Sequence, residues 1–252
     1  MELVDTHAHL EDLENLDEAL GRAEEVGVVA VITMGSDHET NLWALRESMR
    51  RRRGKLRVYP ALGLHPWGLD PSKIDVTVQL VQQNIEEAVA LGEIGLDYWY
   101  KEARKSPEKK EQQRELFRRL LEMARKNGKP VSIHSRGAWA DCVSIAMETG
   151  VEKAVFHWFS GPLKVLEELL DQGYYVSATP AAAYSKEHRD AIKRTPLDRL
   201  VLETDSTVPY RGEPSEPAHV LKTLCAVAEL KDEKQEKVAE KTTENARSLF
   251  RI

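Results

Sequence analysis

Two histidines one residue apart end the first apolar run of the chain, in the segment Asp5-Thr6-His7-Ala8-His9. Side chains of a β-strand point alternately to its two faces, so His7 and His9 would share a face. Two imidazoles in that arrangement can bind one metal ion. The pair alone is a weak indication, since two solvated histidines at the start of a loop would give the same pattern.

Four further residues of metal-binding type stand late in other apolar runs: Glu93, His134, His157 and Asp205. A lone histidine on an apolar strand is more often a hydrogen-bonded core residue than a ligand. Burying so many ionisable groups together without a metal would cost much free energy. If their strands converge, the set predicts a metal site.

The number of these residues indicates the kind of site. Four imidazoles and two carboxylates exceed what one tetrahedral zinc with an open position needs. They suit two divalent ions about 3.5–4 Å apart that share one carboxylate, and Glu93 is the expected bridge because its run lies between the first run and those of the later histidines. Such an electropositive centre can ionise water and accept an anionic oxygen, so phosphate esters fit it best. The ions could be Mg²⁺, Mn²⁺ or Zn²⁺.

The elements that would carry these residues alternate along the chain. Eight short apolar or β-branched runs occur, at Leu3–His9, Val28–Gly35, Val58–His65, Ala88–Asp97, Pro130–Ser135, Lys153–Phe159, Tyr174–Thr179 and Leu200–Asp205. Charged segments with helical spacing separate or follow them, at Leu16–Val26, Glu39–Arg52, Val76–Glu87, Pro107–Asn127, Ala138–Thr149, Pro162–Gln172, Ser185–Lys193, Pro217–Leu230 and Glu233–Phe250. Strict alternation implies parallel strands with right-handed crossovers.

Eight such units in one chain predict an α/β fold, a closed (β/α)₈ TIM barrel that forms a single domain over residues 1–252. Active sites of such barrels lie at the C-terminal ends of the strands, where the candidate ligands stand. No Gly-x-Gly-x-x-Gly motif follows the first run, which removes the dinucleotide-binding alternative.

Composition narrows the classes of protein. The chain has 252 residues, of which 41% are hydrophobic and 31% charged, enough for a large core and a soluble surface. No apolar run is long enough to span a membrane, and no secretory signal is visible. The two cysteines, Cys142 and Cys225, exclude a disulfide framework and favour a cytoplasmic location. A net charge of -6 argues against broad DNA coating but not against a local basic site, and no obligate protein partner is evident.

The motifs resemble those of TatD-type metal-dependent hydrolases over essentially the whole chain. The resemblance is carried by Asp5–His9, Gly63–Pro66, Gly92–Tyr98, His134–Arg136, His157–Gly161, Leu202–Asp205 and Glu244–Arg247. It implies an amidohydrolase-type barrel with metal-dependent deoxyribonuclease activity, notably 3′→5′ exonuclease action. It also implies one ion held by His7, His9, Glu93 and Asp205 and a second held by Glu93, His134 and His157. By analogy with related barrels, Asp205 would orient the attacking water and take its proton.

Three positions depart from the family pattern near the expected barrel mouth. Trp158 stands where the family commonly has cysteine, and Ser215 replaces a usual asparagine before Glu-Pro. Thr207 and Val208 separate Ser206 from Pro209-Tyr210, where the family usually has Pro-Tyr directly after the aspartate. No expected ligand is lost, so these departures put substrate preference in doubt more than chemistry.

Several residues could contact a substrate. His65 could donate to a phosphate or be a loop histidine fixed by Pro66, and Arg136 shares the facing of His134 and could clamp a phosphate. Trp99 and Trp158 could stack nucleic-acid bases, or simply cover the barrel end. Asp5 and Glu203 are expected to be buried hydrogen-bond partners rather than ligands.

Three functions remain open on these grounds. The first is a two-metal phosphodiesterase that threads single-stranded DNA ends toward the ions. The second is a two-metal ester, lactone or amide hydrolase on the same scaffold. Many such relatives bridge their metals through a modified lysine, and no lysine stands late on any strand here. The third, a non-catalytic binding protein, is disfavoured by the complete ligand set.

Overall fold

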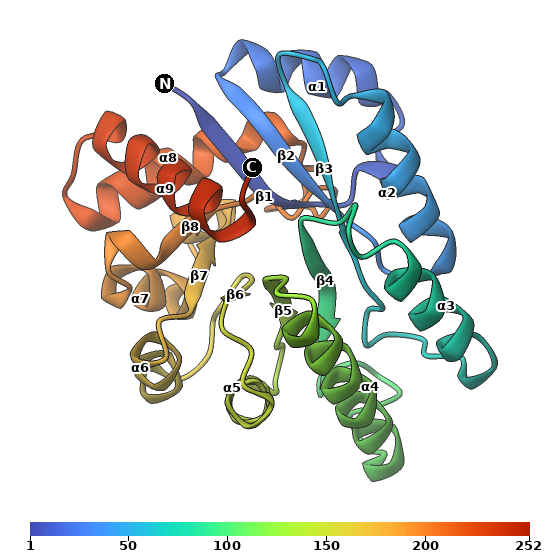
Figure 1. The fold of residues 1–252 in the computed structure, drawn as a ribbon. Coiled ribbons are helices and arrows are strands. Elements are labelled where there is room, and N and C mark those ends of the chain that lie inside the picture. The colour runs from blue at the N-terminus through green and yellow to red at the C-terminus, as the bar shows by residue number, and fades with distance from the viewer.

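The computed structural model describes residues 1–252 and contains eight parallel strands that pair in chain order around a barrel (Figure 1). The strands are β1 (Leu3–Ala8), β2 (Val28–Met34), β3 (Arg57–Leu62), β4 (Ala90–Gly95), β5 (Val131–His134), β6 (Ala154–Phe156), β7 (Tyr175–Ala178) and β8 (Leu200–Leu202). Each lies inside or within one residue of a predicted apolar run. The predicted (β/α)₈ barrel is confirmed.

Helices surround the strands in the ribbon view (Figure 1). They are α1 (Leu16–Glu25), α2 (His38–Arg50), α3 (Pro71–Gln83), α4 (Pro107–Lys126), α5 (Trp139–Thr149), α6 (Leu163–Asp171), α7 (Lys186–Arg194), α8 (Val220–Lys231) and α9 (Gln235–Phe250). Short 3-10 helices lie at Leu10–Asp12, Pro180–Ala183, Leu197–Arg199 and Pro217–His219. None of the helices is long and apolar enough to cross a membrane.

The predicted start of α3 at Val76 is wrong, because the helix begins at Pro71. The Asp70 side chain accepts the backbone N–H of Ser72 at 3.0 Å and so caps the first turn. Pro71 occupies the first helical position, where its missing N–H and fixed φ are tolerated. The first residues of the helix do not show the apolar spacing from which its start was predicted.

The two faces of the strands pack into two separate cores. On β2, Val31 belongs to a cluster of 54 buried residues, whereas Ala30, Ile32 and Met34 belong to a smaller cluster of 11. The smaller cluster also includes Phe250 in the last turn of α9. Alternation along the strand therefore separates the barrel interior from the layer between strands and helices.

The barrel closes between its first and last strands through a few specific bonds. Asp205 donates its backbone N–H to the carbonyl of His7 at 2.9 Å, and His9 donates its own to Ser206 at 2.6 Å. The buried Asp5 carboxylate accepts the backbone N–H of Thr204 at 2.9 Å and its hydroxyl at 2.6 Å. This seam brings the histidines of the first strand beside Asp205.

Candidate metal centre

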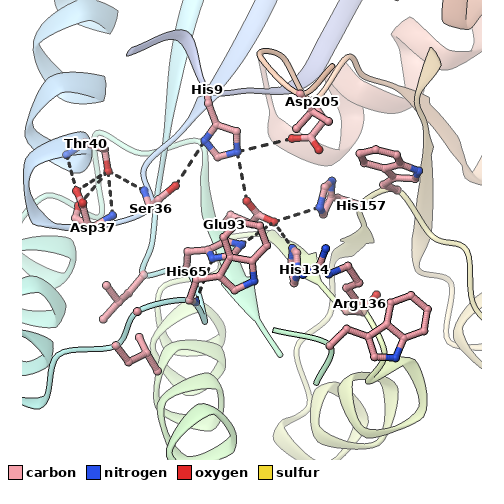
Figure 2. Close-up of a pocket in the computed structure, with 18 of the residues that line it drawn as sticks. His9, Ser36, Asp37, Thr40, His65, Glu93, His134, Arg136, His157 and Asp205 are labelled. Carbon is pink, nitrogen blue, oxygen red and sulfur yellow. Dashed lines mark hydrogen bonds and ion pairs between the residues drawn. The ribbon is translucent and has the colours of Figure 1, made fainter. Parts of the chain in front are cut away.

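The six residues predicted to bind metal lie together at the C-terminal ends of the strands, around Glu93 of β4. Figure 2 labels five of them, all except His7. Oε2 of Glu93 lies 3.4 Å from Nε2 of both His7 and His9. Its Oε1 lies 2.6 Å from Nδ1 of His134 and 3.1 Å from Nε2 of His157. The two carboxylate oxygens thus face two different pairs of imidazoles.

Asp205 follows the eighth strand and belongs to the Oε2 side of the cluster. Its Oδ1 lies 3.6 Å from Nε2 of His7 and 3.7 Å from Nε2 of His9. Its backbone has φ of 50°, an uncommon conformation for a residue other than glycine, and it is held by the seam bond to His7. The seam therefore places this carboxylate opposite the first-strand histidines.

The later histidines each have a carboxylate on the ring nitrogen that faces away from Glu93. Nδ1 of His157 lies 3.1 Å from Oε1 of Glu203, and Nε2 of His134 lies 2.9 Å from Oδ2 of Asp97. A neutral imidazole that donates one N–H keeps a lone pair on its other nitrogen. These contacts leave Nε2 of His157 and Nδ1 of His134 free to bind a cation.

The first-strand histidines have hydroxyl partners instead. Nδ1 of His7 lies 3.3 Å from Oγ of Ser132, and Nδ1 of His9 lies 3.5 Å from Oγ of Ser36. Both Nε2 atoms consequently point to Glu93 and Asp205. His9 also has Glu11 nearby, with Oε1 at 3.7 Å from its Nδ1.

The charges of the cluster are strongly interdependent. Burial raises the pKa of Glu93, but the surrounding imidazoles outweigh it and hold that pKa well below its usual range. Burial lowers the pKa of His157, and the opposing field of Glu93 and Glu203 raises it well above the usual value. For Asp205, burial dominates and raises the pKa. Cation binding must therefore displace protons from imidazoles.

The donor set fits divalent cations, as one buried atom shows directly. Nε2 of His7 is buried and has no hydrogen-bond partner, a costly arrangement unless its lone pair binds a cation. Ligand atoms close enough to share an ion occur in three groups: His7, His9 and Glu93; His7, His157 and Glu203; and His65, Glu93 and His134. Imidazole and carboxylate are common ligands of Zn²⁺ and similar ions.

His65 lies beside the cluster but is not suited to bind metal. Its Nδ1 accepts the backbone N–H of Trp67 at 3.1 Å, so the neutral ring carries its hydrogen on Nε2. That Nε2 lies 3.5 Å from Oε1 of Glu93. Burial lowers the pKa of His65 to about 4, which keeps the ring neutral at physiological pH. The side chain is thus a hydrogen-bond donor at the edge of the cluster.

The remaining predicted residues line one cavity of about 1500 Å³ that opens from the cluster. Arg136, Trp99 and Trp158 all contribute to its wall, and Trp99 is 57% exposed. Trp99 packs edge-to-face with Trp139, and Trp158 lies 5.4 Å from the ring of Tyr210. The sequence-based expectations thus converge on a single site.

Sequence reasoning missed Asp97, the acid that holds His134. Asp97 is completely buried and stands four residues after Glu93 in the Gly92–Tyr98 motif. A signal was available in the sequence: Asp97 is an acidic residue just beyond the end of β4, the strand that carries the candidate ligand Glu93. Glu203 is a buried hydrogen-bond partner, as expected, and Asp5 is one too, although it holds the seam rather than a ligand.

The barrel and its histidine-carboxylate mouth define the class of metal-dependent hydrolases. Residues 4–251 match the family model described as TatD related DNase, and the chain belongs to this family. It is 34% identical to "Uncharacterized metal-dependent hydrolase YabD" of Bacillus subtilis, over 99% of each chain. It is 32% identical to human "Deoxyribonuclease TATDN3", over 98% of this chain and 94% of that protein. The crystal structure of YJJV, a TatD homologue from Escherichia coli, superposes with a TM-score of 0.89 at 28% identity, covering 99% of this chain and 98% of that one.

Proposed function

We propose that this hydrolase is a deoxyribonuclease that cleaves phosphodiester bonds from the 3′ end of single-stranded DNA with two divalent ions, Mg²⁺, Mn²⁺ or Zn²⁺. The observation that carries the proposal is the placement of Glu93, whose two oxygens face separate sets of imidazoles. One carboxylate shared in this way is typical of two-metal hydrolytic sites. The name of the human relative supports DNA as the substrate.

Under this proposal, each of the two ions has its own set of ligands, and Glu93 belongs to both. His7, His9 and Asp205 would hold one ion with Oε2 of Glu93, while His134 and His157 would hold the other with Oε1. Divalent ions at these positions supply Lewis acidity, which activates water and neutralises charge on a phosphate.

The residues of the chain orient the reactants. Asp205 would hold the attacking water and take its proton, because its Oδ1 lies at the edge of the cluster and its seam bond fixes its backbone. His65 would donate its Nε2–H to a phosphate oxygen, since its other ring nitrogen is already an acceptor.

The cavity wall suits a single strand. Arg136 would contact a phosphate with its terminal amino groups, because its Nε already donates to Asp97 at 2.8 Å. Trp99 and Trp158 would stack bases along the cavity. We expect this arrangement to admit a single strand rather than a duplex, so the strand end would be threaded toward the cluster.

Oligonucleotides labelled at either end test the proposal. With a panel of Mg²⁺, Mn²⁺ and Zn²⁺, we expect 5′-labelled single strands to shorten stepwise from the 3′ end, and EDTA to abolish cleavage. Closed circular single strands should resist. Cutting of circles at the rate of linear strands would contradict end threading. Hydrolysis of lactones or amides without any nuclease activity would instead support the alternative, a two-metal ester, lactone or amide hydrolase.

We also propose a reducing compartment such as the cytoplasm. Both cysteines are free, with Cys142 buried in α5 and Cys225 exposed on α8. A free exposed thiol is stable in a reducing environment. Fractionation of source cells with an antibody to the chain should find it there, and recovery from a secreted fraction would contradict this.

A further inference from the structure

The carboxylate of Asp97 accepts five hydrogen bonds from residues at or beyond the C-terminal ends of β3, β4 and β5. Its Oδ2 accepts from Nε2 of His134 at 2.9 Å, Nε of Arg136 at 2.8 Å and Nε1 of Trp67 at 2.6 Å. Its Oδ1 accepts the backbone N–H groups of Trp99 at 2.9 Å and Tyr100 at 2.8 Å. Asp97 is completely buried, and it joins His134 to three residues of the cavity wall, Trp67, Trp99 and Arg136.

The contact with His134 determines which ring nitrogen faces the cluster. Donation from Nε2 to Asp97 keeps a hydrogen on that atom. Nδ1 then faces Oε1 of Glu93, 2.6 Å away, and it is the nitrogen whose proton a cation would displace. Partners of this kind fix the orientation of a ligating imidazole and increase its basicity. Without the carboxylate, the ring could rotate or carry its hydrogen on Nδ1.

The contact with Asp97 holds the guanidinium group of Arg136 against the cavity wall. Nε is occupied by Asp97, and the guanidinium carbon lies 5.1 Å from the ring of Trp67, whose indole N–H is held by the same oxygen. The Arg136 side chain remains 45% exposed and lines the cavity. Its two terminal amino groups are therefore left for an anion.

We propose that Asp97 is a positioning residue that sets the ligand tautomer of His134 and the orientation of Arg136 together. One carboxylate would then couple cation affinity on the Oε1 side of Glu93 to recognition of a substrate phosphate. Five donors converge on it, which an amide cannot reproduce because its nitrogen is itself a donor. The cation part rests on the two-ion site of the proposed function, and the phosphate part rests also on its nuclease activity.

Gln113 of α4 provides a matched control. Its Oε1 accepts the backbone N–H of Asp97 at 3.0 Å, and its Nε2 donates to the carbonyl of Pro66 at 2.9 Å. Gln113 therefore joins the loop after β3, which contains Pro66, to the loop after β4, which contains Asp97. It does so without contacting the Asp97 carboxylate or His134. A purely structural role of Asp97 would be disturbed similarly by Gln113→Ala.

The first experiment titrates Zn²⁺ or Mn²⁺ into apo protein against a chelating indicator. We expect wild type to bind two equivalents, and Asp97→Asn to bind one of them about 10–100-fold more weakly, the loss typical when such a partner is removed. Gln113→Ala should bind both as wild type does. Wild-type affinities in Asp97→Asn, or an equal loss in Gln113→Ala, would overturn the proposal.

A second readout remains available even if Asp97→Asn does not fold. In Zn²⁺-loaded wild type, long-range ¹H–¹⁵N spectra of the His134 ring should show the hydrogen on Nε2. A hydrogen on Nδ1 would overturn the proposal. With bis-(p-nitrophenyl) phosphate as substrate, Asp97→Asn should also raise KM at saturating metal, and an unchanged KM would overturn the phosphate part. A protein that binds two ions but cuts no DNA would contradict the nuclease function alone.

Discussion

Glu203 and His157 are joined through a 3.1 Å contact between Oε1 and Nδ1, and the same oxygen accepts the backbone N–H of Trp158 at 3.1 Å. The acid thus holds a candidate ligand and the residue after it. Glu203→Ala should weaken metal binding about 10–100-fold. Glu203→Gln should cost less, because its amide oxygen can still accept both bonds. Calorimetric titration with Zn²⁺ would compare them, and equal affinities in both variants would contradict this role.

The charge of Glu93 should be essential for loading the site. Glu93→Gln preserves size but removes the negative charge that faces both sets of imidazoles, so turnover should fall by orders of magnitude. Bound metal, measured by elemental analysis, should also fall, while circular dichroism stays unchanged. Glu122→Gln, at an exposed position on α4, is the matched control. Near-normal turnover of Glu93→Gln would rule out the bridging role.

Loss of the Asp205 carboxylate should separate metal binding from turnover. Asp205→Asn removes the group proposed to take a proton from water, while the backbone bond to His7 remains possible. We expect turnover to be nearly lost and the ion on the Oε1 side of Glu93 to be retained. If Asp205→Asn had full metal occupancy in a crystal structure and wild-type turnover, Asp205 would not be the group that takes the proton from water.

Trp99 and Arg136 should differ in what they contribute. Stacking contributes about 1–3 kcal/mol per base, so Trp99→Ala should weaken binding of a phosphorothioate single strand without changing metal content. Arg136→Ala should also lower kcat, because a charged contact near the ions steadies the transition state. Fluorescence anisotropy and steady-state rates measure the two effects. With a net charge of -6, binding should be weak and sensitive to salt. Unchanged binding by Trp99→Ala would exclude stacking there.

His188 should make stability depend on pH. It donates Nδ1–H to the carbonyl of Phe159 at 2.8 Å and accepts the N–H of Thr179 at 3.1 Å, and burial lowers its pKa to about 4 from 6.5. Between these values the unfolded chain binds a proton that the folded protein excludes, so stability present above pH 6.5 is lost as pH falls toward 4. The loss is up to about 3 kcal/mol.

His188→Gln offers the comparison, since its amide can both donate and accept. In urea unfolding of the apo protein at pH 4.5, 5.5 and 6.5, the free energy of unfolding should fall less steeply for this variant than for wild type. Parallel slopes would show that His188 does not contribute.

The barrel could be predicted because its information is local. Each strand is an apolar run of its own, and each candidate ligand stands at the end of one, so alternation alone places them at a common mouth. The start of α3 could not be found this way, because Asp70 and Pro71 act through capping rather than through apolar spacing. The 3-10 turns are likewise too short to show periodicity.

The connections within the site could not be predicted, because they join residues far apart in the chain. Asp97 contacts Trp67 in the loop after β3 and His134 at the end of β5. Arg136 was expected to face the cavity, and it does line it, but the sequence does not show that its Nε is already bonded. The tautomer of each histidine depends on such partners, which only the folded arrangement reveals.

The seam between β1 and β8 also has a consequence for biosynthesis. His7 and His9 are made early in synthesis, but their partner Asp205 is made only after all eight strands. The group formed by these three residues cannot exist until the last strand has been made. A chain interrupted before Asp205 would leave His7 and His9 at an open sheet edge without this carboxylate, so complete loading with metal must follow ring closure.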